Sequence, residues 1–196
     1  SSAKLGKFLE MNSNLRSCTK AKAACGFIVD GARSPMEWKC FMLLTLSHVK
    51  GGAKLPAPKL NSRIDLKTPI QAIDQWGYPR IINSLECDLV WDEKRLVVAE
   101  YQGKEWHSDE SALLRDAVKN NRLVGQNITL FELTKDIVYD EVAFSEFCET
   151  LAKALNHRNR VRTASAYEKS RILRRAIMPA NWFEQAISKS HQARKR

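Results

Sequence analysis

Two short apolar segments near the middle of the chain each carry one acid where an apolar residue would be expected. They lie in ECDLVWDEKRLVVAEYQGKEWH, which runs from Glu86 to His107. Their valine, leucine and aromatic content predicts β-strands at 81–91 and 95–102, joined as a hairpin. An unpaired carboxylate in a buried strand is costly, so Asp88 and Glu100 are expected to have a partner or a function.

The length of the hairpin loop decides whether these two acids share a face of the sheet. Side chains alternate along a strand, and a three-residue loop, 93–95, places Asp88 directly opposite Glu100. A two-residue loop would place them on opposite faces. Adjacent carboxylates repel, and a hard divalent cation with oxygen ligands relieves that repulsion, with the Tyr101 carbonyl as a further ligand. The alternative is a strand edge with ordinary surface acids.

Signals elsewhere in the chain place this hairpin in an α/β arrangement with a helical C-terminal extension. Ser34, Pro35 and Glu37 form a capping box that predicts the start of a largely buried helix. Further elements are expected as a short strand near 60–66, a helix at 108–124, a strand at 127–133, and helices at 140–155, 166–178 and 181–190. The predicted organisation is an irregular or weakly helical lead-in (1–33), an α/β core (34–155) and a basic helical extension (156–196).

Charge is distributed unevenly along the chain. The 196 residues carry a formal net charge of +10, and from Arg158 onward there are eleven basic residues and only two acids, Glu168 and Glu184. This asymmetry favours a polyanionic partner, either nucleic acid or an anionic membrane surface, although a solvated tail explains it equally well. The five cysteines have no zinc-ligand spacing, so we expect reduced thiols and no zinc site.

The sequence has no stretch that approaches eighteen consecutive apolar residues, and its first thirty residues lack the order of a secretory signal. We therefore expect a cytoplasmic protein that does not enter a membrane. The chain begins with Ser rather than Met, which is compatible with a processed or cloned fragment.

One stretch of the chain resembles a known superfamily of nucleases. The run CDLVW…LVVAEYQGKEWH…LLRDAVKNNRLVGQNITLFELT is similar to the PD-(D/E)XK, or restriction-endonuclease-like, superfamily. The similarity is to the branch related to very-short-patch repair endonucleases and to small bacterial endonuclease-like domains found with abortive-infection and toxin-type proteins. It covers roughly residues 34–134. It implies a restriction-endonuclease-like core, with a mixed central sheet flanked by helices, and it is compatible with a role in bacterial defence.

Carried over by position, the resemblance implies that Asp88 and Glu100 bind Mg²⁺ or Mn²⁺. Gln102 would stand where the superfamily usually has lysine or, in this branch, aspartate. Glu37 matches an acid that completes the cluster in many members, and His107 matches a histidine that handles the attacking water or the leaving group.

Two of these positions have a simpler explanation, and a third departs from the pattern of the superfamily. Glu37 is fully accounted for by its capping box, and His107 lies just before a predicted helix start, where a surface histidine is ordinary. Gln102 departs from the pattern because an amide can hydrogen-bond to water but supplies no charge.

Two basic surfaces are candidates for contact with nucleic acid. Arg115, Lys119 and Arg122 recur along one face of the helix predicted after His107. In AYEKSRILRRAIM, a capping box at Ser165 and Glu168 and an apolar strip of Ile172, Leu173 and Ile177 predict an amphipathic helix. The basic residues of that helix are Lys169, Arg171, Arg174 and Arg175. A membrane surface is the weaker alternative because the strip is narrow and lacks aromatic residues.

The combined prediction is a metal-dependent nuclease that hydrolyses phosphodiester bonds in DNA. The alternative is a catalytically inactive nucleic-acid-binding or protein-interaction module on the same fold, for which Gln102 is the main argument. A homodimer or a protein partner bound through the C-terminal helices is a further expectation.

Overall fold

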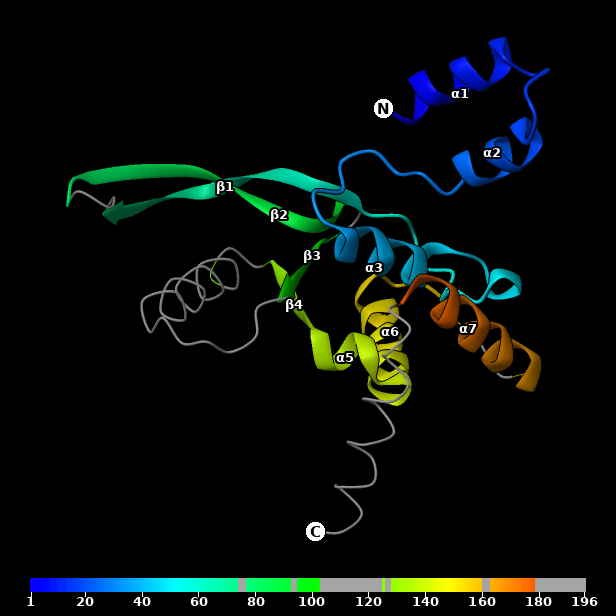
Figure 1. The fold of residues 1–196 in the computed structure, drawn as a ribbon. Helices are drawn as coiled ribbons and strands as arrows, with labels where there is room; N and C mark the ends of the chain where they lie inside the picture. Colours follow the sequence, from blue (N-terminus) through cyan, green and yellow to red (C-terminus); the bar gives the residue numbers. More distant parts are fainter. Residues whose placement is uncertain (74–76, 93–94, 103–124, 126–127, 160–162, 179–196) are drawn as a thin grey trace.

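The structure is a computed structural model of the 196-residue chain. The structure describes residues 1–73, 77–92, 95–102, 125, 128–159 and 163–178. Its elements in chain order are α1 (Ser2–Met11), α2 (Cys18–Cys25), α3 (Pro35–Thr45), the 3-10 helix η1 (His48–Lys50), β1 (Lys59–Ile73), β2 (Pro79–Asp92), β3 (Leu96–Gln102), β4 (Thr129–Thr134), α5 (Lys135–Tyr139), α6 (Glu141–Ala154) and α7 (Ala164–Ile177) (Figure 1).

The four strands form one mixed sheet in the order β1-β2-β3-β4. β1 pairs antiparallel with β2, and β2 pairs antiparallel with β3, whereas β4 runs parallel to β3. A parallel neighbour requires a crossover connection, and the 26 residues between β3 and β4 are long enough for one. The predicted α/β class is confirmed.

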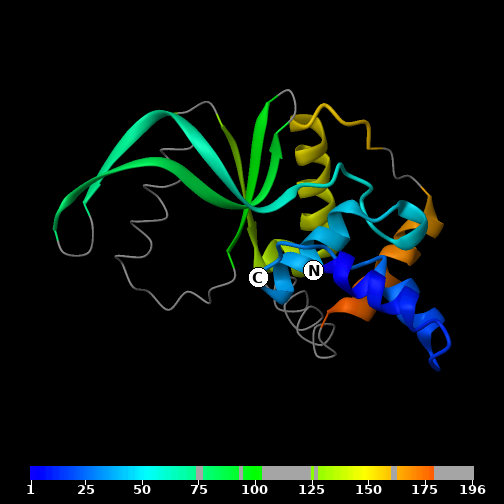
Figure 2. The same cartoon turned by 90° about the horizontal axis from the view of Figure 1, so that it is seen from above.

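Two apolar clusters cover the two faces of this sheet. The larger cluster joins α3, α5, α6 and α7 to one face, with Leu89, Val97 and Leu133 among the fully buried strand residues. The smaller cluster lies on the other face and consists of Ile64, Cys87, Val90, Val98 and Ile128. The helices of the larger cluster gather at one end of the sheet (Figure 2).

α3 begins where the sequence predicts it. Ser34 is the N-cap, its side chain accepts a hydrogen bond from the Glu37 N–H at 3.2 Å, and Pro35 occupies the first turn. The cap satisfies one of the backbone donors that a helix start leaves open. Glu37 therefore lies in the first turn of α3.

The β1–β2 hairpin is much longer than the sequence suggested. Instead of a short strand at 60–66 followed by a loop, β1 continues through Pro69 to Ile73 and pairs with β2, with a register shift between Asp65 and Ile70. The outer part of this ribbon, residues 67–73 and 77–83, extends beyond the helices (Figures 1 and 2), and we call it the arm. The inner part, residues 59–66 and 84–92, is the base. A bulge lets proline sit in an edge strand without interrupting the pairing.

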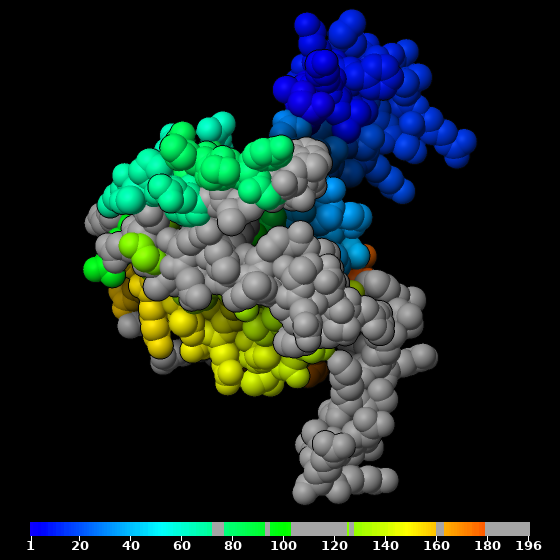
Figure 3. Space-filling view, turned by 90° about the vertical axis from the view of Figure 1, so that its left-hand side faces the viewer, coloured from blue at the N-terminus to red at the C-terminus, as the bar shows by residue number. Residues whose placement is uncertain are grey.

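The lead-in contains two short helices, α1 and α2, which agrees with the helical alternative predicted for this segment. They are linked back to the segment before α3 by hydrogen bonds from the Ser2 N–H and hydroxyl to the Asp30 carboxylate at 2.8 and 2.7 Å. Leu9 and Cys18 are their buried apolar residues, while Phe8 and Met11 are exposed. The pair (blue) stands off from the rest of the molecule (Figure 3).

α7 begins two residues before the predicted capping box. Its N-cap is Thr163, whose hydroxyl accepts from the Ala166 N–H at 3.3 Å, so the prediction of Ser165 as N-cap is wrong. Ser165 and Glu168 already lie within the helix. The predicted helices at 108–124 and 181–190 fall outside the described residues. None of the described helices has the length and apolar character needed to cross a membrane.

Candidate metal centre

Asp88 and Glu100 lie on neighbouring strands in the register that the three-residue hairpin predicts. The β2–β3 ladder pairs Asp92 with Leu96, Trp91 with Val97, Val90 with Val98 and Leu89 with Ala99. The next positions along the two strands are Asp88 and Glu100, so the two acids occupy opposite positions one step beyond the last pair of the ladder. The register expectation is confirmed, and the alternative two-residue loop is excluded.

The Asp88 carboxylate is held in place by the backbone of β3. Its Oδ2 accepts a hydrogen bond from the Tyr101 N–H at 2.9 Å. The strands therefore stay connected through a side chain at the point where the ladder of main-chain hydrogen bonds stops. This bond fixes the direction of the Asp88 carboxylate, because an acceptor bound to a backbone donor cannot rotate away without losing it.

Glu100 is 8% exposed, which is unusual for a carboxylate. Its Oε1 atom is shielded from solvent. On the other side of β3, the parallel register places Glu132 of β4 next to Glu100. On β1, Asn61 lies between the pairs Leu60–Leu89 and Ser62–Cys87, which places it opposite Asp88. One row across the sheet thus contains Asn61, Asp88, Glu100 and Glu132.

Glu37 is buried beside this row and fastens α3 to β1. Its Oε2 accepts hydrogen bonds from the Arg33 N–H at 2.8 Å and from the Asn61 side-chain amide at 2.5 Å. Burial raises the pKa of Glu37, but hydrogen bonds from Arg33, Asn61 and Ser34 outweigh it and leave the pKa below its ordinary value. Glu37 therefore stays ionised, and its capping-box role is accompanied by a second role as a tether for Asn61.

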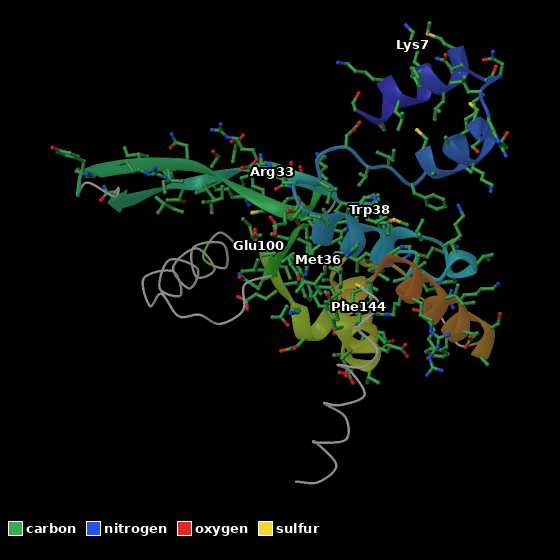
Figure 4. All side chains as sticks on the ribbon, in the orientation of Figure 1. Lys7, Arg33, Met36, Trp38, Glu100 and Phe144 are labelled. Carbon is green, nitrogen blue, oxygen red and sulfur yellow. The ribbon has the colours of Figure 1, made fainter. Side chains whose placement is uncertain are left out.

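Arg33 brings a positive charge to the acids. Its guanidinium forms a two-pronged ion pair with Glu86, which includes a bond from Nη1 to Oε2 at 2.7 Å. This pairing raises the pKa of Arg33, and the Glu37 and Asp88 carboxylates add to the effect. In the view of Figure 4, Arg33 and Glu100 both lie where the sheet meets the start of α3.

Cys40 lies within electrostatic range of both Asp88 and Glu37. Burial raises the pKa of its thiol to about 12, and the Asp88 and Glu37 carboxylates contribute to the increase. Cys40 is fully buried on α3. Its thiol is therefore a packing group and not a nucleophile.

Tyr101 and Gln102 complete β3 beyond the acids. Tyr101 packs against the larger apolar cluster, and burial raises its pKa to about 12. This agrees with the alternation that assigned it to the core face. Gln102 is half-buried beside Thr134 of β4.

The basic residues of α7 have different environments, and Arg174 requires a correction. Arg174 is 2% exposed, donates from Nη1 to the Val138 carbonyl at 2.6 Å, and lies over the Phe144 ring at 4.6 Å from its centroid. Burial lowers its pKa. Because the guanidinium is enclosed between α5, α6 and α7, Arg174 is not available to nucleic acid as the sequence suggested.

The remaining residues of α7 are nearer the surface. Arg171 pairs with Glu141 at 3.2 Å, Arg175 is exposed, and Lys169 is half-buried. The expected apolar strip is only partly correct, since Leu173 is buried but Ile172 is 57% exposed. A hollow of about 430 Å³ lies between η1, α6 and α7, with Arg174 at its wall, and it is separate from the acid row.

Four expected site residues, His107, Arg115, Lys119 and Arg122, lie outside the described residues. Conversely, the sequence did not single out Arg33, Asn61, Glu86 or Glu132. Asn61 carries no motif, although its φ of 44° marks an unusual backbone position at the row of acids. Arg33 directly precedes the helix cap, and only the fold reveals its contact with Glu86.

The donor set of the acid row suits a hard divalent cation. Within the described ranges, no three His, Cys, Asp or Glu side chains converge in a geometry that would hold a metal. Two carboxylates from Asp88 and Glu100, with backbone carbonyl and water oxygens, are nevertheless what Mg²⁺ commonly uses. The row can thus supply oxygen ligands but not a complete cage.

Comparisons of the chain with protein-family models, with curated proteins and with solved structures found no match.

Proposed function

We propose that this chain is a Mg²⁺- or Mn²⁺-dependent nuclease that hydrolyses phosphodiester bonds in DNA on a restriction-endonuclease-like fold. The observation that carries the proposal is the register of β2 and β3, which puts Asp88 and Glu100 at opposite positions one step beyond the end of their ladder. A mixed sheet flanked by helices is also what the sequence resemblance implies.

Asp88 and Glu100 are the groups that would hold the metal. The Tyr101 N–H orients Asp88, and burial of Glu100 limits its alternative positions. When bound, the ion would activate water and offset the charge that develops on the scissile phosphate. Mn²⁺ can replace Mg²⁺ because both accept carboxylate and water oxygens.

Other residues at the row would position the reacting groups. Gln102 follows Glu100 on the same face of β3 and can orient a water by hydrogen bonding, without contributing charge. Arg33 holds Glu86 in an ion pair and so keeps this neighbouring carboxylate from competing for the metal. Glu37 keeps Asn61 fixed opposite Asp88.

The second candidate is a binding module that does not cleave. The observation that favours it is Arg33, whose charge acts on both Asp88 and Glu37 and could take the place of a metal. In that case the acid row would be a structural ion network. Gln102, which stands where the superfamily usually has lysine, also favours a module that does not cleave.

Cleavage assays and metal titration separate the two candidates. The purified chain would be incubated with plasmid DNA and Mg²⁺ or Mn²⁺, beside Asp88→Asn and Glu100→Gln. Removing a metal ligand takes away several kcal/mol of transition-state stabilisation, so each variant is expected to cut roughly a thousandfold more slowly. Asp92→Asn is the matched control, because Asp92 is exposed on the same strand, four residues away.

Calorimetric titration with Mg²⁺ or Mn²⁺ gives a readout that does not depend on turnover. The native chain and Asp92→Asn should bind the ion, whereas Glu100→Gln should not. If Asp88→Asn and Glu100→Gln cut as fast as the native chain, the nuclease proposal is wrong. DNA binding without cleavage and without metal affinity would support the binding module instead.

A further inference from the structure

The arm has no core of its own within the described part of the chain. None of its described side chains is buried, and Ile81 and Tyr78 are 68% and 69% exposed. An isolated two-stranded ribbon is at best marginally stable in water. Because the arm contributes little to the stability of the fold, we consider it a candidate binding element.

The edge of the arm is protected against pairing with another strand. Pro69 lies in β1, which is the edge strand of the sheet, and removes a donor there. The register shift between Asp65 and Ile70 bends the edge, and the exposed Lys67 adds a charge. Proline, bulges and lysine are the features with which edge strands avoid strand addition. A partner that adds a β-strand is thus disfavoured.

The charge and width of the arm suit a nucleic-acid groove. Lys67 and Arg80 are exposed, and neither forms an ion pair with another described residue. Over 67–83 the sequence has these two cations and a single acid, Asp74. The major groove of DNA, about 12 Å wide, admits a two-stranded β-ribbon. A groove also supplies the phosphates that Lys67 and Arg80 would contact.

The arm is continuous with the acid row because β2 belongs to both. Arg80 and Asp88 are eight positions apart on this strand, which at about 3.3 Å per residue separates them by roughly 26 Å. DNA rises about 3.4 Å per base pair, so this separation corresponds to about eight base pairs. A duplex that contacts both places must extend by that length to one side of Asp88.

We propose that the arm inserts into a groove of duplex DNA and holds it through Lys67 and Arg80, about eight base pairs to one side of the phosphate at Asp88. This inference rests on the proposed function for its substrate. It goes further because it specifies a duplex and a one-sided length requirement. Single-stranded DNA, which has no groove, would not engage the arm.

Binding of the full chain to a fluorescent duplex, measured by anisotropy with EDTA to prevent cleavage, tests the interaction directly. The slope of log K against log salt becomes shallower by about 0.9 for each DNA phosphate that the protein no longer neutralises. The double variant Lys67→Gln, Arg80→Gln should therefore reduce the slope by about 1.8. The matched control is Lys4→Gln, Arg16→Gln, which removes the same charges from exposed positions at α1 and before α2 and should leave the slope unchanged.

Duplexes shortened from one end provide the second measurement. Affinity should drop once fewer than about eight base pairs remain on the arm's side, and Lys67→Gln, Arg80→Gln should abolish this length dependence. Equal slopes for the native chain and the arm variant would overturn the proposal, as would an equal fall in both double variants. The proposal would also be overturned if the native chain self-associates, and Ile81→Arg abolishes that self-association without changing DNA binding.

The two proposals can fail separately. If Asp88-dependent cleavage is observed but arm variants bind and cut like the native chain, the arm inference is wrong and the nuclease proposal stands. If no cleavage occurs but the arm variant reduces the salt slope, the nuclease proposal is wrong and the arm inference stands. An unfolding midpoint of the arm variant equal to that of the native chain confirms that its fold is intact.

Discussion

The base and the arm belong to the same hairpin, but their environments differ. Both are paired strands, yet the base contributes Ile64, Leu89 and Trp91 to two apolar clusters, whereas the described side chains of the arm are exposed or half-buried. Hydrogen-bonded pairing is common to both regions, so burial of side chains is what distinguishes them. Burial stabilises the base, and the arm extends from it with most of its described side chains exposed.

The basic residues differ between the two regions in the same way. Arg174, in the body of the molecule, is enclosed and bound to Val138 and Phe144. Lys67 and Arg80, on the arm, are exposed. A cation in a basic stretch of sequence can thus be a packing group, and a sparse pair of cations can form the more accessible surface.

The largest effect on stability is expected from truncating the base. Leu89→Ala removes a fully buried side chain and should lower the free energy of unfolding by about 3 kcal/mol, because transfer energy is forfeited and a cavity remains. Ile81→Ala, the matched change on the arm, should alter it by less than about 0.5 kcal/mol. Urea denaturation of both variants measures the difference. Equal losses would show that the arm is packed in solution.

Removing the buried cation should have the next largest effect. Arg174→Ala eliminates a charged hydrogen bond and a desolvated cation–π interaction, so a decrease of about 2 kcal/mol in unfolding free energy is expected. Arg80→Ala should be close to neutral because its side chain is exposed. Thermal and urea unfolding would provide the values. If Arg174→Ala leaves the unfolding free energy unchanged, the buried Arg174 contributes no more to stability than the exposed Arg80.

A smaller effect is expected at the start of α7, which packs against the larger apolar cluster. Thr163→Ala removes the N-cap and should cost about 1 kcal/mol, whereas Ser165→Ala, within the first turn, should cost a few tenths at most. The comparison is made by chemical denaturation of the two variants under one condition. A larger loss of unfolding free energy for Ser165→Ala than for Thr163→Ala would show that Ser165 is the N-cap, as the sequence suggested.

The smallest effect depends on pH and concerns the attachment of the base to α3. The folded-state pKa of Glu37 is lowered, so its ionised form contributes stability above the unfolded-state pKa of about 4.5. This contribution disappears as pH falls through the lower folded-state pKa. The native chain should therefore be more stable than Glu37→Gln near pH 7, by a margin that shrinks in acid.

Unfolding titrations of both proteins from neutral to acid pH measure that margin. Glu10→Gln, which removes the same charge from an exposed position on α1, serves as the control. A margin that grows toward acid pH would contradict the direction given for Glu37.

Much of the sheet and of the acid pair could be predicted from local patterns. Alternation and a three-residue hairpin loop predicted the register that puts Asp88 opposite Glu100, because both properties are set within a few residues. The Ser34 cap was equally local. The extent of the arm was not predicted, because Pro69 and scattered polar residues are typical of a loop, and only pairing with β2 turns them into a strand. Nor was the environment of Arg174, whose burial depends on α5 and α6.

The sequence by itself determined the local features of this protein: a helix start at Ser34, strands on either side of a short turn, and two acids at opposite positions of the hairpin. Tertiary structure decided which charges are buried and which are presented to solvent. Arg33 meets Glu86 across 53 residues, and Arg174 meets Val138 across 36. Such pairings depend on how whole elements pack, and packing is set by burial summed over many distant residues, which no short pattern contains.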